Sequence, residues 1–100
     1  MNWKENKINV AIQVLPEADD KVKYSLVDAA IEAIQKSGFQ YRVCPFETVV
    51  ECSFIELSGL LETLHEACKN AGTERMLTNL KIQVDFHSQV SMKDKMEKYD

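Results

Sequence analysis

The chain has 100 residues, of which 45% are hydrophobic and 28% charged, a composition typical of soluble globular proteins. This length predicts a single domain over residues 1–100 with one hydrophobic core. The formal net charge is −4, and the Lys and Arg residues are scattered along the chain. Because binding to phosphates requires clustered basic side chains, a nucleic-acid partner is not expected.

Membrane and redox signals favour a cytoplasmic location. No apolar run approaches the roughly 18 residues that span a bilayer, and residues 1–7 lack the apolar segment of a signal peptide. The three cysteines, Cys44, Cys52 and Cys68, are odd in number and show no C-x-x-C spacing. They are therefore predicted to be reduced, partly buried thiols, with neither a disulfide nor a metal site.

The first elements in chain order are a strand and a helix. Apolar residues alternate over residues 8–15, which predicts a strand with one buried face, and Pro16 ends it. After a polar connection at residues 17–21, apolar residues follow helical spacing. Ser37 and Gly38 close this helix, since glycine suits the left-handed conformation of a C-cap.

A hairpin and a second helix are predicted next. Residues 39–44 alternate, and residues 48–54 are rich in β-branched and aromatic side chains, so both read as strands. The short turn at residues 45–47 makes them an antiparallel hairpin. A leucine-rich stripe predicts a helix over about residues 55–71, which Gly72 stops.

A fourth strand over residues 76–86 and a short terminal helix over residues 91–99 complete the pattern. The order β-α-β-β-α-β plus a tail is that of a ferredoxin-like α+β fold. Right-handed crossovers then give a four-stranded antiparallel sheet with both helices on one face. The first and third strands are expected at its centre.

The sheet face without helices, called the open face below, carries the functional signal. Strand alternation gives this face a mixture of amides, charges and apolar side chains, whereas a solvated face would show more long charged residues. These residues are Asn9, Ala11, Gln13, Leu15, Gln40, Arg42, Cys44, Phe46, Val49, Glu51, Ser53, Leu77, Asn79, Lys81, Gln83 and Asp85. The mixture suggests that another subunit or a ligand covers the open face.

Glu51 is the most informative of these residues. A carboxylate in mid-strand on a covered face needs partners, and Gln13, Arg42 and Lys81 are candidates. Two interpretations remain open. One is a structural ion pair at a subunit interface, and the other is a pocket in which Glu51 and nearby amides bind a polar ligand.

Several motifs, in this order and spacing, resemble the YkoF-like thiamine-binding family over nearly the whole chain. They are AIQVLP at 11–16, SG at 37–38, PFETVVE at 45–51, the H-x-A of the second helix at 65–67, MLTNLKI at 76–82 and DKMEKY at 94–99. The resemblance implies a ferredoxin-like fold and a homo-oligomer, either a dimer or a dimer of dimers (a homotetramer). It also implies binding of thiamine or its hydroxymethyl-pyrimidine moiety.

The resemblance also suggests candidate ligand-binding residues. They are Gln13, Thr48, Glu51, Thr78 and Asn79, with Phe46 and Tyr24 as stacking or apolar walls. A carboxylate or amide oxygen can accept from the amino group of an aminopyrimidine, and the thiazolium cation favours carboxylates or aromatic faces. The family commonly has Gly after this acidic position, where this chain has Cys52. Alternation points Cys52 toward the helices, so we expect it in the core.

The predicted function is that of a cytosolic small-molecule binding protein without catalytic residues, cofactor or metal. The alternative is a structural oligomeric domain that assembles through the open face and binds no ligand. The sequence shows no catalytic set of a nucleophile, a general base and a group that orients the base. His65 is expected to be a boundary histidine with a satisfied hydrogen bond rather than a metal ligand.

Overall fold

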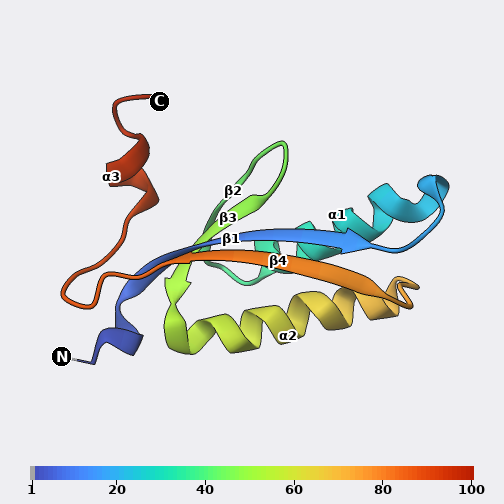
Figure 1. Cartoon of the computed structure of the whole chain (residues 1–100), viewed down its shortest axis with the longest axis horizontal. Coiled ribbons are helices and arrows are strands. Elements are labelled where there is room, and N and C mark those ends of the chain that lie inside the picture. Colours follow the sequence, from blue (N-terminus) through green and yellow to red (C-terminus); the bar gives the residue numbers. More distant parts are fainter. Residues whose placement is uncertain (1) are drawn as a thin grey trace.

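The computed structural model describes residues 2–100 and, at residues 20 and 21, the backbone alone. Its elements follow the predicted order and confirm the ferredoxin-like α+β fold (Figure 1). They are a short 3-10 helix η1 (Trp3–Glu5), β1 (Lys7–Pro16), α1 (Asp20–Lys36), β2 (Gln40–Val43), β3 (Thr48–Ser53), α2 (Phe54–Asn70), β4 (Met76–Gln83) and α3 (Met92–Met96). Among the described residues, no helix is both long and apolar enough to cross a membrane.

The four strands form one antiparallel sheet in the order β2-β3-β1-β4. The first and third strands are therefore central, as the alternation pattern predicted. Asn9 of β1 pairs with Glu51 of β3 on one side and with Gln83 of β4 on the other. Directly paired residues point to the same face of a sheet, so these three side chains share the open face.

The core lies between the sheet and the two long helices. Residues of both central strands and both helices form one buried cluster: Ile8, Val10, Ile12, Ala33, Ile34, Val50, Cys52, Leu57, Leu60 and Leu64. Cys52 is in this cluster, as expected from alternation. Burial raises the pKa of its thiol to about 11, so the group is neutral at physiological pH.

The start of α2 is fixed by a capping box, a reciprocal pair of hydrogen bonds at a helix N-terminus. Glu56 N donates to Ser53 Oγ at 3.2 Å, and Ser53 N donates to Glu56 Oε1 at 2.9 Å. The bond from the Ser53 backbone holds the pKa of the Glu56 carboxyl below its ordinary value. Gly72, with φ of +110°, follows the end of α2 in the left-handed region, which explains the predicted stop.

The fourth strand is shorter than the alternation pattern predicts, since β4 ends at Gln83. Beyond it, the Asp85 carboxylate accepts hydrogen bonds from the backbone N–H groups of His87 and Ser88, at 2.8 and 3.2 Å. This local turn competes with strand pairing. Phe86 leaves the sheet and meets the Trp3 ring edge-on, with centroids 5.0 Å apart.

The last part of the chain, residues 90–100, is called the C-terminal segment. In Figure 1, its helix α3 and the long helix α2 lie on opposite sides of β1 and β4. Val90 N donates to Lys7 O at 2.9 Å, which ties the start of the segment to β1. Helix α3 itself makes few contacts with other elements, and the segment is attached through the buried Val90 side chain and through individual polar bonds.

Candidate ligand-binding site

Glu51 lies on the open face, half-buried in the middle of β3. Its Oε1 accepts a hydrogen bond from the backbone N–H of Met92 at 2.9 Å. The partner that a half-buried carboxylate requires is therefore supplied by the chain's own C-terminal segment.

The partners expected for Glu51 from sequence bind elsewhere, which corrects that interpretation. Arg42 forms a bidentate ion pair with Asp100, in which Nη1 donates to Oδ2 at 3.0 Å and Nη2 donates to Oδ1 at 3.1 Å. Lys81 Nζ lies 3.0 Å from Glu47 Oε1. Both pairs are local to the open face, but neither neutralises Glu51.

A groove of about 770 Å³ separates the C-terminal segment from the open face. It is called the C-terminal groove, and its lining includes Asn9, Gln40, Arg42, Val49, Met92 and Met96. A smaller hollow of about 290 Å³ adjoins it and shares Asn9, Val49 and Lys95. Glu51 is flanked by three groove-lining residues, because it pairs with Asn9 and Gln40 and accepts from Met92.

Three of the seven candidate site residues lie on the open face: Gln13, Glu51 and Asn79. Asn79 Nδ2 donates to Gln13 Oε1 at 3.1 Å across paired strands. Gln13 is four residues beyond Asn9, the residue opposite Glu51, so the amide pair lies roughly 13 Å further along β1. The open face thus offers two separate polar positions rather than one cluster.

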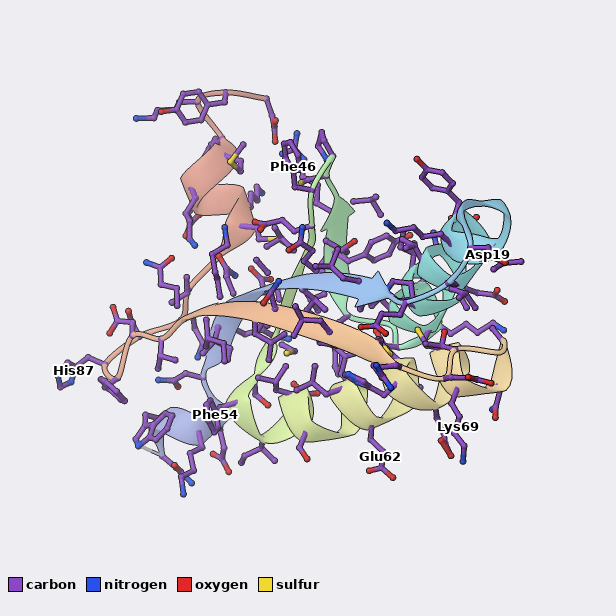
Figure 2. The ribbon with its side chains drawn as sticks, turned by 45° about the vertical axis from the view of Figure 1, so that its right-hand side comes forward. Asp19, Phe46, Phe54, Glu62, Lys69 and His87 are labelled. Atoms are coloured by element: carbon purple, nitrogen blue, oxygen red, sulfur yellow. The ribbon has the colours of Figure 1, made fainter. Side chains whose placement is uncertain are left out.

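The other candidates lie away from these positions. Thr48 is buried and pairs with Ile12, so it faces the helices, and Thr78 also lies on that side. Tyr24 on α1 is 78% exposed and Phe46 is 79% exposed. Figure 2 shows Phe46 at the tip of the β2–β3 hairpin. A small hollow of about 100 Å³ beside α1 is lined by three of the candidates, Gln13, Phe46 and Thr48, but Glu51 does not line it.

His65 has both ring nitrogens engaged, which confirms it as a boundary histidine with satisfied hydrogen bonds. Nδ1 lies 2.7 Å from Leu61 O and Nε2 lies 2.8 Å from Thr78 Oγ1. A carbonyl oxygen only accepts, so Nδ1 donates to Leu61 O, while Nε2 shares its hydrogen bond with the threonine hydroxyl. Within residues 2–100, no three His, Cys, Asp or Glu side chains converge to hold a metal ion.

Asn9 is the residue that sequence reasoning did not single out. It is only 5% exposed, although its side chain is on the open face. Its Nδ2 donates to Val90 O at 3.2 Å. Its position between the apolar Ile8 and Val10 of a central strand was the available signal, because a polar side chain there has to be accommodated.

The sequence matches the profile of the family described as thiamine-binding protein over residues 10–100. A UPF0045 protein of Clostridium perfringens is 33% identical over 91 residues, covering 91% of this chain and 95% of that protein. The chain belongs to the thiamine-binding protein family, and the resemblance to the YkoF-like proteins is confirmed. This membership indicates a small-molecule binding role.

Solved structures share the whole fold. A domain of unknown function, DUF77, from Bacillus cereus superposes with a TM-score of 0.88 at 33% identity, covering 100% of this chain and 96% of that one. A candidate thiamine biosynthesis/salvage protein from Thermotoga maritima gives a TM-score of 0.86 at 29% identity, covering 94% and 99%. The C-terminal segment is therefore included in the matched length of the first of these relatives.

Proposed function

We propose that this protein binds thiamine or its hydroxymethyl-pyrimidine moiety on the open face, without transforming it. The observation that supports this most directly is Glu51, a half-buried carboxylate in mid-sheet whose neighbours line the C-terminal groove. Family membership and the Thermotoga maritima relative support the ligand class.

The chemistry of the groove suits such a ligand. Its volume of about 770 Å³ falls within the range of small-molecule sites. The Glu51 carboxylate can accept a hydrogen bond from the pyrimidine amino group, and its charge attracts the thiazolium cation of thiamine. The Gln13–Asn79 amide pair offers a second polar position on the same face.

The other candidate residues need a different role. Thr48 and Thr78 face the helices, and Phe46 and Tyr24 are almost fully exposed. They are not part of the proposed contact with the pyrimidine at Glu51.

Calorimetric titration tests the proposal. The protein is unfolded, dialysed and refolded to remove any carried-over ligand, and is then titrated with thiamine and with hydroxymethyl-pyrimidine. Saturable heat is expected with at least one of them and not with pyridoxine, a heteroaromatic control of similar size. The absence of saturable heat with both pyrimidine ligands would overturn the proposal.

We also propose that the protein is a cytoplasmic homo-oligomer, either a dimer or a dimer of dimers. Apolar side chains exposed on the open face support assembly, notably Leu77, which is 59% exposed. The free cysteines are compatible with a reducing compartment. Native mass spectrometry of ligand-free protein tests the assembly, and a monomer at micromolar concentration contradicts it. Assembly without any heat of ligand binding would favour the alternative, a purely structural oligomeric domain.

A further inference from the structure

The Asn9 side chain contains a buried hydrogen-bond acceptor that lacks a donor. Its Oδ1 is inaccessible and has no hydrogen-bond partner among residues 2–100. The bond from Nδ2 to Val90 O sets which way the amide points, because the rotated amide would lose that bond and place its oxygen against the Val90 carbonyl. Buried polar groups in folded proteins are nearly always paired, and an unpaired one needs an explanation.

The residue that carries the unpaired oxygen lies directly beside Glu51. Asn9 and Glu51 are directly opposite each other on neighbouring strands, where side chains begin about 5 Å apart. Asn9 also lines both the C-terminal groove and the adjoining hollow. Asn9 and Glu51 therefore place two acceptor groups at adjacent positions of the sheet, next to the C-terminal groove.

Paired acceptors match one ligand group in particular. An exocyclic aromatic amino group carries two N–H donors in one plane, and each can go to a different oxygen. An oxo group at the same ring position donates nothing and would face two oxygens. We propose that Asn9 Oδ1 and the Glu51 carboxylate form an amino-selective acceptor pair, gated by residues 90–92. This inference rests on the proposed function, because it names what the same site selects.

The gate follows from how the two acceptors are held. The backbone of Val90 accepts from Asn9, and the backbone of Met92 donates to Glu51, so the same short stretch contacts both residues. Because the Asn9 oxygen is inaccessible, a ligand reaches it only after a local rearrangement, and residues 90–92 are the stretch that is bonded to both acceptor residues. The rest of the C-terminal segment, after residue 92, makes few contacts with other elements. The ion pair at its end, Arg42–Asp100, is about half exposed. Such a pair contributes little to holding the segment down.

The test compares two ligands on the wild-type protein. These are 4-amino-5-hydroxymethyl-2-methylpyrimidine and the analogue with a 4-oxo group in place of the amino group. A site with two acceptors should prefer the amino compound by about 100-fold or more, because the oxo compound leaves buried polar groups unpaired. Equal affinity for the two compounds would overturn the inference while leaving the proposed function intact.

A variant then assigns the preference to Asn9. Asn9→Ala should weaken binding of the amino compound about tenfold and leave the oxo compound nearly unchanged, so the preference falls. Asn70→Ala, at the exposed end of α2, is the matched control and should keep the full preference. Full preference in Asn9→Ala would remove Asn9 from the site.

Two further outcomes are also decisive. If the wild type binds neither compound, the inference fails, and the proposed function fails with it only if thiamine also gives no saturable heat. If Asn9→Ala does not fold, the preference for the amino over the oxo compound is measured in Asn9→Ser instead. A reduced preference supports the role of Asn9, and equal affinity of the wild type for the two compounds still overturns the inference.

Discussion

The two faces of the sheet are stabilised in different ways. The face toward α1 and α2 is closed by apolar side chains, several of them with no exposed surface, such as Val10, Val50 and Leu64. The open face is covered only in part, by a segment attached through the buried Val90 side chain and through individual hydrogen bonds such as Met92 N to Glu51. Apolar burial is non-directional and hard to replace, whereas a hydrogen-bonded cover can be exchanged for another partner. The first face therefore specifies the fold, and the second is suited to binding.

The largest expected effect is on the helix-covered face. Leu64→Ala removes a side chain that is 0% exposed and leaves a cavity between α2 and the sheet. The free energy of unfolding should fall by about 2–5 kcal/mol, measured by urea denaturation followed by circular dichroism. A loss well below 1 kcal/mol would show that this face is less tightly packed than its burial indicates.

The corresponding change on the open face should act on binding rather than on stability. Glu51→Gln keeps an acceptor for Met92 N but removes the charge, so binding of thiamine should weaken by about 1–3 kcal/mol. Glu62→Gln is the matched control, since Figure 2 shows Glu62 pointing away from the molecule on α2. An unchanged dissociation constant in Glu51→Gln would show that this carboxylate does not contact the ligand.

The capping box gives a smaller effect, and this effect depends on pH. Ser53→Ala removes the side-chain bond to Glu56 N and should destabilise the protein by about 1 kcal/mol near neutral pH.

The sign of the pH dependence follows from the lowered pKa of Glu56 in the folded state. The stability that its carboxylate contributes is present above the ordinary Glu pKa of about 4.3 and is lost as pH falls through the lower, folded value. Urea denaturation of Glu56→Gln and wild type at pH 7 and pH 3 should therefore give a difference that shrinks at pH 3. A difference that grows on acidification would contradict this origin.

The smallest effect is expected at the end of the C-terminal segment. Asp100→Ala breaks an ion pair whose side chains are 49% and 53% exposed, so global stability should change by less than about 1 kcal/mol. Hydrogen exchange of residues 91–100 should nevertheless become faster, because the segment loses one of its few attachments. Unchanged exchange would mean that other contacts hold the segment in place.

Most of the fold follows from local patterns in the sequence. Alternation in β1 and β3 placed both central strands, and the glycines that follow α1 and α2 marked their ends. The end of β4 at Gln83 was not predicted, because a side-chain hydrogen bond and a long-range aromatic contact outweigh the alternation pattern after that residue. Asp85 binds the backbone of its own turn, and Phe86 packs on Trp3 from the other end of the chain.

The candidate site was predictable only in part. Alternation placed Glu51 on the open face, but its partner is a backbone N–H 41 positions away, which leaves no mark in the side-chain pattern. Thr48 and Thr78 were proposed from motif resemblance. Their positions in the alternation of β3 and β4, however, put them on the face of the sheet that Glu51 does not share. Alternation had also placed Asn9 on the open face with Glu51, but its near-complete burial and its bond to Val90 O depend on the C-terminal segment and leave no mark in the pattern.

The aromatic contact at the chain's beginning provides a built-in optical probe. Trp3 is the only tryptophan, and its ring lies edge-on to Phe54 at the start of α2 and to Phe86 beyond β4. The stretch that contains Phe86 leads directly into the C-terminal segment. Intrinsic fluorescence can therefore follow motion of that segment in unlabelled protein, without any dye that would itself occupy the groove.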